Sequence, residues 1–212
     1  MKHKFGTFEK KISAIKKKNL LRTLHDSKVE KQYIFQNGQK LLNFSSNDYL
    51  GIKSEKIKHT QFQSSSRLVS GNDTSFSILE KKLSAHKSQE KTIVFPTGYM
   101  ANIGTISSIA DKESTIFSDE LNHASIVEAC KLSGAKIKIF KHNDMEDLEK
   151  NIRKTIGKKL IITEGIFSMD GDWSKLNHIS ELSEKYGVLT VLDDAHGDFV
   201  LGKDGKGTSN FF

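Results

Sequence analysis

From about residue 76 onward, short apolar runs alternate with stretches in which apolar residues recur every three or four positions. Short continuous apolar runs are typical of buried strands, and the longer recurrence is typical of helices that cover them. The pattern predicts strands at 92–95, 114–117, 135–140, 159–163 and 188–192, with helices at 76–87, 98–110, 123–134, 145–156 and 175–187. Such alternation indicates an α/β fold, a mostly parallel sheet with helices on both faces.

The first 50 residues follow a different pattern. Phe5, Phe8, Ile12 and Ile15 recur at helical spacing in a lysine-rich segment, which predicts a packed amphipathic helix. Further on, Asn37-Gly38 separates two apolar runs and predicts a β-hairpin, because both residues tolerate positive φ. We therefore expect an N-terminal helix and hairpin segment over 1–50 and part of a larger domain over 51–212.

Composition narrows the class of protein. The 212 residues are 36% hydrophobic and 28% charged, with a net charge of +7. The basic excess is nearly all lysine, and no aromatic ladder accompanies it, so we expect a solvated surface rather than a nucleic-acid site. One cysteine, Cys130, excludes an internal disulfide and suits a reducing compartment. Without an apolar run long enough for a signal or a membrane span, the expected location is the cytoplasm.

Polar residues follow several of the predicted strands. Open parallel sheets bind ligands beyond the carboxyl ends of their strands, so these residues should meet at one edge. They are Gly98, Tyr99, Glu164, Ser168, Asp193 and His196. Their convergence, more than any single motif, predicts a functional site.

Three single motifs each allow an ordinary explanation. Gly98 begins a helix after a strand, where free amides favour a phosphate, but the same pattern occurs in many strand-to-helix turns. His123 also begins a helix, and could be a surface capping residue, a base or a ring stacked on an aromatic ligand. Glu164 follows a buried strand directly, where a carboxylate is costly unless it is paired or faces a site.

The acidic doublet Asp193-Asp194 with His196 has three interpretations. Two acids and a histidine could bind a metal, although no second histidine motif stands at ligand spacing. One acid could cap the following turn. An aspartate could instead pair with a cofactor ring nitrogen and keep it protonated. The residues alone leave these three open.

A series of motifs resembles one enzyme family. They are "NFSSNDYLG", "SSSRLVSGN", "PTGYMAN", "NHASIVEA", "HND", "TEGIFSMDGD" and "DDAHGDFVLGKDGKG". Their order and content resemble the α-oxoamine synthases, pyridoxal-phosphate enzymes of the aspartate aminotransferase-like fold. "SSNDYLG", "TEGIFSMDGD" and "DDAHG" resemble the branch that joins L-alanine to a pimeloyl thioester, carried by coenzyme A or acyl carrier protein, in biotin synthesis. The alternative is another branch, such as glycine C-acetyltransferase.

The resemblance implies a role for each matching residue. Gly98 and Tyr99 match residues at the cofactor phosphate and ring, and His123 matches the imidazole that stacks on the ring. Asp193 matches the acid bonded to the pyridine nitrogen, and His196 the donor to the phenolic oxygen. Ser168 and Glu164 match polar residues on the cofactor side, and Asn47 matches one near the amino-acid carboxylate. The segment "QFQSSSR" departs from the glycine-rich family pattern.

The resemblance also implies a lysine that forms a Schiff base, in a segment downstream of the Asp-x-x-His strand. We expect that segment and the C-terminal domain to be absent here. The nearest downstream lysines, Lys203 and Lys206, match surface positions. The chain alone should then not catalyse the condensation. The resemblance also implies a homodimer for the complete protein. Other classes are a non-catalytic fragment that binds cofactor or dimerises, and a metal-dependent hydrolase.

Overall fold

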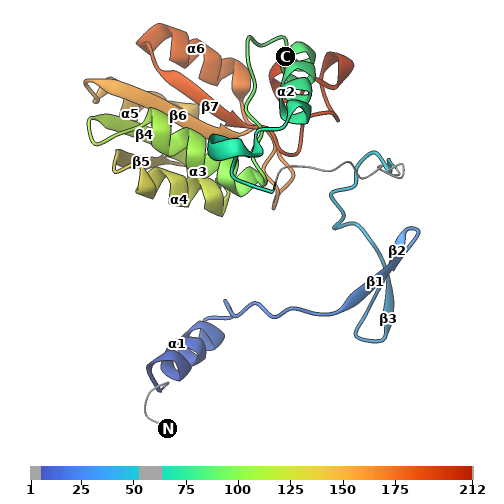
Figure 1. The fold of residues 1–212 in the computed structure, drawn as a ribbon. Coiled ribbons are helices and arrows are strands. Elements are labelled where there is room, and N and C mark those ends of the chain that lie inside the picture. Colours follow the sequence, from blue (N-terminus) through green and yellow to red (C-terminus); the bar gives the residue numbers. More distant parts are fainter. Residues whose placement is uncertain (1–5, 53–63, 212) are drawn as a thin grey trace. The chain divides into compact units, whose positions relative to one another are not determined.

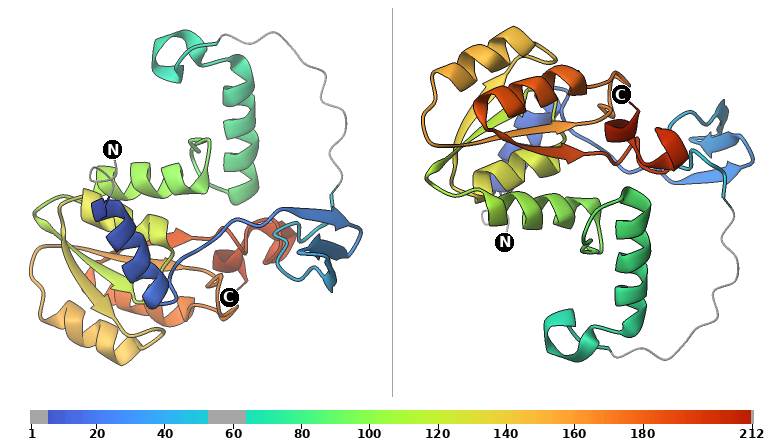
Figure 2. Two further views of the ribbon diagram at one scale, coloured as in Figure 1. Left: turned by 90° about the horizontal axis from the view of Figure 1, so that it is seen from below. Right: turned by 90° about the horizontal axis from the view of Figure 1, so that it is seen from above.

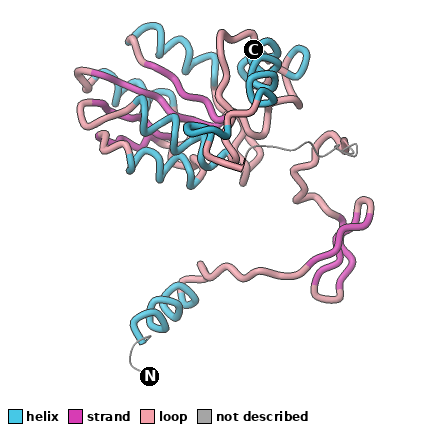
Figure 3. The backbone as a smooth tube through the Cα atoms, viewed as in Figure 1, coloured by secondary structure: helices cyan, strands magenta, loops and turns pink. Residues whose placement is uncertain are grey.

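The computed structural model describes residues 6–52 and 64–211 and divides into two units, Met1–Tyr49 and Leu50–Phe212. In Figure 3 the strands form two separate groups, which are an antiparallel sheet in the first unit and a parallel sheet in the second. Among the described helices, none is both long and apolar enough to span a membrane.

The described part of the first unit contains one helix and three short strands. Helix α1 (Gly6–Lys17) confirms the predicted helix, with Phe5 outside the described residues. Its apolar side chains Phe8, Ile12 and Ile15 are exposed, so the expected packing is not observed. The strands are β1 (Ser27–Glu30), β2 (Tyr33–Gln36) and β3 (Gln39–Leu42).

The Asn37-Gly38 hairpin is confirmed. Strands β2 and β3 pair antiparallel, and both turn residues have positive φ, 51° at Asn37 and 75° at Gly38. This conformation matches the twist of the flanking strands. Strand β1 adds a second antiparallel pair, which the sequence did not predict because its four residues "SKVE" carry a single apolar side chain.

The second unit has the predicted alternation of helices and strands (Figure 1). Its strands are β4 (Ser114–Asp119), β5 (Lys136–Phe140), β6 (Lys158–Glu164) and β7 (Leu189–Asp193). Its helices are η1 (Arg67–Gly71), α2 (Thr74–Lys87), α3 (Gly98–Ile109), α4 (Ala124–Leu132), α5 (Met145–Arg153), α6 (Leu176–Tyr186), η2 (Lys203–Gly205) and η3 (Thr208–Asn210). All four strands are parallel, in the order β5-β4-β6-β7.

Helices cover both faces of this sheet, as Figure 2 shows from two sides. On one face α3 and α4 pack on Ile116 of β4, and on the other α5 and α6 pack on the adjacent Phe117. Neighbouring residues of a strand point to opposite faces, so one buried strand supplies both apolar cores. Local caps set the helix ends: Asp144 accepts a hydrogen bond from Asp147 N, and Gly187 follows α6 with a φ of 60°.

The predicted strand at 92–95 is wrong. These residues have no regular secondary structure and pair with no strand among the described residues, and Ile93 is 71% exposed. Side chains take the backbone groups instead: Val94 N donates to Glu80 Oε1 and Val94 O accepts from Arg67 Nη1, each over 3.0 Å. An apolar β-branched run gives local preference for an extended chain, but a strand also needs a neighbouring strand.

Candidate functional site

A cavity of about 570 Å³ lies between helix α3 and the carboxyl end of strand β7. Its lining includes Gly98 and Asn102 from α3, Asp193 from β7, and Lys87 from the end of α2. Its volume falls within the range of small-molecule sites. Parallel strands bring their carboxyl ends to one edge, and the cavity lies at that edge, where the sequence predicts a ligand.

Asp193 ends β7 with its carboxylate held from two sides. Its Oδ1 accepts from Ala195 N over 3.0 Å, and its Oδ2 accepts from Asn102 Nδ2 over 2.7 Å. These donors fix the orientation of a half-buried charge without neutralising it. A carboxylate held in this way can pair with a cationic group of a ligand in the cavity.

A chain of hydrogen bonds joins Asp193 to His123. The Asn102 amide that donates to Asp193 also donates to Ser125 Oγ over 2.9 Å. The Ser125 oxygen lies 2.7 Å from His123 Nδ1, and the Ser125 backbone N–H also points at that nitrogen. Since Asn102 supplies a proton to Ser125, the serine hydroxyl is free to donate to Nδ1. A neutral His123 then carries its proton on Nε2.

Helix α4 begins at His123, which accepts a hydrogen bond from Ser125 N as its N-cap. The capping role that the sequence left open is therefore real. The ring is exposed and meets the edge of the Tyr99 ring, with 6.5 Å between the ring centroids. The same residue thus caps a helix and presents an aromatic face near the start of α3.

Glu164 is 4% exposed and lies beside Asp193, its register partner across β6 and β7. Its Oε1 accepts from the backbone N–H of His123, and the Ser168 amide also donates to its carboxylate. Burial, together with the charges of Asp193 and Asp119, raises the pKa of Glu164 to about 7 against the opposing effect of the two backbone donors. The residue therefore connects the start of α4 to the loop after β6.

The two acids of the doublet, Asp193 and Asp194, have different hydrogen-bond partners. The Asp194 carboxylate accepts two hydrogen bonds from Thr208, one of 2.8 Å from the backbone N and one of 2.6 Å from Oγ1. Burial raises the pKa of Asp194 despite these donors. A side chain at Gly165, Gly197 or Gly207 would collide with this carboxylate, which explains the three glycines around it. Asp194 is thus the acid that anchors a turn.

The remaining predicted site residues have separate positions. Ser168 is exposed in the loop after β6, and His196 is half-buried in the turn after β7, outside the set that lines the cavity. Asn47 belongs to the first unit, where its Oδ1 accepts from the Tyr49 hydroxyl over 3.4 Å. Its role near a substrate stays a prediction. Part of "QFQSSSR", residues 61–63, lies outside the described residues.

Sequence reasoning missed Asn102, Ser125 and Lys87. Asn102 and Ser125 follow the glycine and histidine motifs by a few residues, on the same helices, which is the signal that could have found them. Lys87 gave no signal. It reaches the cavity from α2, where its Nζ donates to Asp198 Oδ1 over 2.9 Å and to Lys206 O over 2.6 Å.

The donor set fits the cofactor that the resemblance implies. The carboxylate of Asp193 suits a protonated ring nitrogen, and the first amides of α3, at Gly98 and Tyr99, suit a phosphate. Apart from its chain neighbours and its own helix backbone, no heavy atom of the described residues lies within 4 Å of the position that a Cβ on Gly98 would take, so space for a ligand group is open there. Within the described part of the chain, no group of three or more His, Cys, Asp or Glu residues is placed to hold a metal.

A parallel sheet with a cavity between a helix start and a strand end is typical of α/β proteins that bind a phosphorylated cofactor. The profile of the aminotransferase class I and II family matches residues 39–209, and the chain belongs to this family. An 8-amino-7-oxononanoate synthase from Lysinibacillus sphaericus is 42% identical over 97% of this chain and 56% of its own length. The chain thus spans about half the length of such relatives.

Solved structures of serine palmitoyltransferase share the fold. The Sphingomonas wittichii enzyme has a TM-score of 0.82 and 29% identity, over 98% of this chain and 56% of that one. A structure of SPT with PLP also has a TM-score of 0.82, at 26% identity and the same coverage. These likenesses support the α/β assignment and confirm the parallel sheet.

Proposed function

We propose that these residues form the pyridoxal-phosphate-binding part of an 8-amino-7-oxononanoate synthase, which condenses L-alanine with a pimeloyl thioester and releases carbon dioxide. The observation that carries this proposal is the position of Asp193 in a cavity shared with Gly98. Relatives with that name match nearly the whole chain at about 40% identity, which supports this branch of the family over others.

The bound cofactor supplies an electron sink for the Cα atom of the amino acid. In this proposal Asp193 keeps the ring nitrogen protonated through a charge-assisted hydrogen bond. Asn102 and the Ala195 amide hold its carboxylate in place for that bond. The amides of Gly98 and Tyr99 bind the phosphate at the positive end of the α3 dipole.

His123 covers one face of the ring in the same proposal. Its Nδ1 is occupied by Ser125, so its orientation is set by the chain of bonds that also orients Asp193. His196 donates to the phenolic oxygen, and Asn47 binds near the amino-acid carboxylate. Glu164 and Ser168 support the cofactor side through the backbone of His123 and the loop after β6.

We further infer that these 212 residues alone bind the cofactor without a covalent bond and do not catalyse the condensation. Lys87 is the one lysine among the described residues that line the cavity. Its ammonium forms an ion pair with Asp198 and donates a hydrogen bond to Lys206 O. An ammonium held by a carboxylate is a poor nucleophile toward an aldehyde, because the amine must first lose its proton. We also propose that the full-length protein acts in the cytoplasm and that it is a homodimer.

The test is a titration of the purified chain with pyridoxal phosphate, followed by circular dichroism in the cofactor absorption band. Asp193→Asn should weaken binding about 10- to 100-fold, the usual effect of losing a hydrogen bond to a charged group. Asp204→Asn, at an exposed position, is the matched control and should bind normally. Equal affinity of the Asp193 variant and the native chain would reject the assigned role.

Borohydride reduction followed by peptide mass spectrometry tests the non-covalent state. We expect no pyridoxyl group on the peptide that carries Lys87. A label there at stoichiometric cofactor, or release of an amino ketone from L-alanine and pimeloyl-CoA by the chain alone, would contradict the inference.

A further inference from the structure

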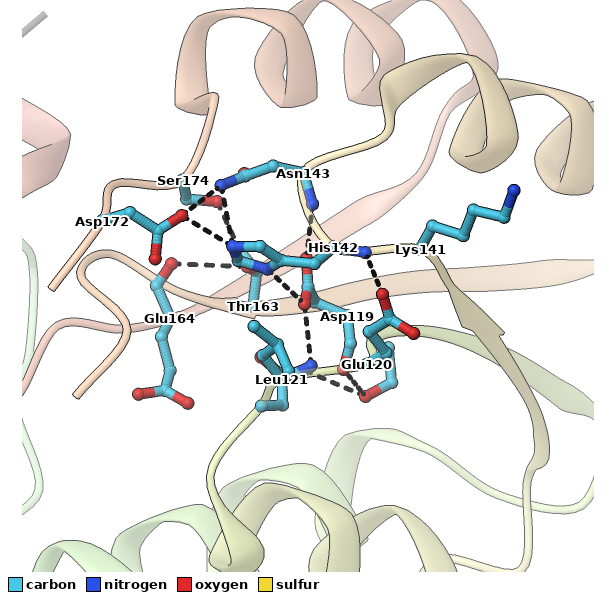
Figure 4. A network of polar contacts seen from close by, with 12 residues as sticks. Asp119, Glu120, Leu121, Lys141, His142, Asn143, Thr163, Glu164, Asp172 and Ser174 are labelled. Atoms are coloured by element: carbon cyan, nitrogen blue, oxygen red, sulfur yellow. Dashed lines mark hydrogen bonds and ion pairs between the residues drawn. The ribbon is translucent and has the colours of Figure 1, made fainter. Parts of the chain in front are cut away.

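The imidazole of His142 lies between two carboxylates, as Figure 4 shows. Its Nδ1 is 2.9 Å from Asp119 Oδ1, and its Nε2 is 2.6 Å from Asp172 Oδ2. A neutral imidazole has one N–H and could donate to one of these carboxylates, while its other nitrogen would turn a lone pair toward the second. Both contacts are attractive only when the ring carries two protons.

The surroundings of the ring favour that charged form. Asp119 ends β4 with a side chain 1% exposed, and its oxygens also accept from Leu121 N and Asn143 N. Burial of the ring opposes its charge, but the hydrogen bonds and charges of Asp119 and Asp172 outweigh burial and raise the pKa of His142. These two acids are the charged groups that face the ring.

Neutral groups complete the contacts of His142. The Phe167 ring meets the imidazole at 90° with 4.4 Å between centroids, and the Asn143 amide lies 3.2 Å from Nε2. Glu120 bonds to the backbone N–H of His142 instead of the ring. The ring is therefore fixed in place by the ends of two strands and by the loop that follows a third.

That loop, residues 165–174, is tied to the His142 segment at several points. Asp172 binds the imidazole, and the Asn143 side chain donates to Asp172 Oδ2 over 2.9 Å and to Trp173 O over 3.0 Å. Phe167 in the same loop packs on the ring and donates its amide to Asp172 O. The ion pair with Asp172 thus acts on the same loop that Asn143 and Phe167 hold.

The loop also reaches the candidate cofactor site. Gly165 N donates to Asp193 O over 2.7 Å, and the Ser168 amide donates to Glu164. Glu164 in turn holds the backbone N–H of His123. A continuous set of contacts therefore runs from His142 through the loop to the residues assigned to the cofactor.

We propose that His142 is a positioning residue, a doubly protonated imidazole clamped between Asp119 and Asp172, which fixes the 165–174 loop and through Glu164 the His123 backbone. Its effect on cofactor binding rests on the proposed function, whereas the clamp itself does not. Since the folded protein binds this proton more tightly than the unfolded chain, the stabilisation is complete below about pH 6.5 and disappears as the pH rises through the native value.

The first test needs no cofactor. Nitrogen-15 NMR of the histidine rings in the 212-residue chain should show both His142 nitrogens protonated at pH 6.5, with a titration midpoint above the ordinary value. Asp172→Asn keeps the shape of the partner without its charge and should lower that midpoint. A midpoint at or below about 6.5 in the native chain, or one unmoved by Asp172→Asn, would overturn the clamp.

Hydrogen exchange measures what the clamp holds. After correction for any difference in global stability between the two proteins, His142→Gln should lower the protection of amides 165–174 about tenfold. The protection of the β4 amides should stay unchanged. His178→Gln, on the exposed face of α6, is the matched control and should change neither. Protection of the native loop should also fall as the pH rises past the His142 midpoint. Unchanged loop protection in the His142 variant would overturn the positioning role.

Cofactor titration then tests the link to the site. His142→Gln should weaken pyridoxal-phosphate binding severalfold. In the native chain, the affinity for pyridoxal phosphate should fall as the pH rises through the His142 titration. Equal affinity of this variant and the native chain would overturn the link. If the native chain binds no cofactor, the proposed function and this link both fail, and the NMR and exchange results still decide the clamp.

Discussion

Asn102 and Asp193 are 91 residues apart in the chain, yet Asn102 Nδ2 donates to Asp193 Oδ2 over 2.7 Å. The same amide donates to Ser125 Oγ over 2.9 Å, so one side chain orients the acid on β7 and the start of α4 together. A hydrogen bond from an amide to a carboxylate contributes more to stability than a hydrogen bond between neutral groups, because one partner is charged. The geometry of the cavity therefore depends on α3 as much as on β7.

Replacing Asn102 should loosen this connection. Asn102→Ala removes the donor to both Asp193 and Ser125, and we expect the free energy of unfolding to fall by about 1–3 kcal/mol. Cofactor affinity should fall about tenfold, since the acid loses its fixed orientation. Asn177→Ala, at an exposed position of α6, is the control for both measurements. Urea denaturation that gives the same stability for both variants would contradict the role of Asn102.

Glu164 should make stability depend on pH. Its pKa is raised to about 7 by burial and by the charges of Asp193 and Asp119, so the native state binds this proton more tightly than the unfolded chain. Stability from this group is present below about pH 4.5 and is lost as the pH rises toward 7, by about 1–3 kcal/mol. Glu164→Gln should remove that part of the decline, while Glu128→Gln on the surface of α4 should not. Urea midpoints from pH 4.5 to 7.5 measure the difference.

Thr208 anchors the turn that follows β7 by donating to Asp194. The hydroxyl is 2.6 Å from Asp194 Oδ1, and the residue is fully buried. Thr208→Val leaves a half-buried carboxylate with one donor fewer, and we expect a loss of about 1–3 kcal/mol in the free energy of unfolding. Thr208→Ser keeps the hydroxyl and should lose less. A serine variant no more stable than the valine variant would show that packing, rather than the hydrogen bond, is responsible.

Cys130 should not react while the protein is folded. The residue is 1% exposed within the α3–α4 core, and burial raises the pKa of its thiol to about 11. The reactive thiolate is therefore scarce at neutral pH and screened from reagent. Labelling with a thiol-specific disulfide reagent at pH 7.5 should proceed at the rate of unfolding, and rapidly in denaturant. Fast labelling of the native chain would place Cys130 outside the core.

The sequence by itself determined the elements whose signals are local. Short apolar runs predicted β4, β6 and β7, because a strand covered on both faces needs apolar residues throughout, and alternating apolar and basic residues predicted β5. Asp144 and Gly187 marked helix ends, and Asn37-Gly38 marked the hairpin, because these conformations need particular side chains at particular positions. The parallel direction of the strands then followed from the alternation of helices and strands, and so did the edge at which the polar residues were expected to meet.

Tertiary structure decided the partners of each polar group. The run at 92–95 resembles a strand, but Glu80 and Arg67 take its backbone groups. The doublet offered two equivalent acids, and only the fold gives Asp193 to Asn102 and Asp194 to Thr208. His142 likewise gained its two carboxylates from elements far apart in the chain. A hydrogen bond tolerates a deviation of only a few tenths of an ångström in its donor–acceptor distance, and that distance is set by the packing of helices on the sheet rather than by residue spacing.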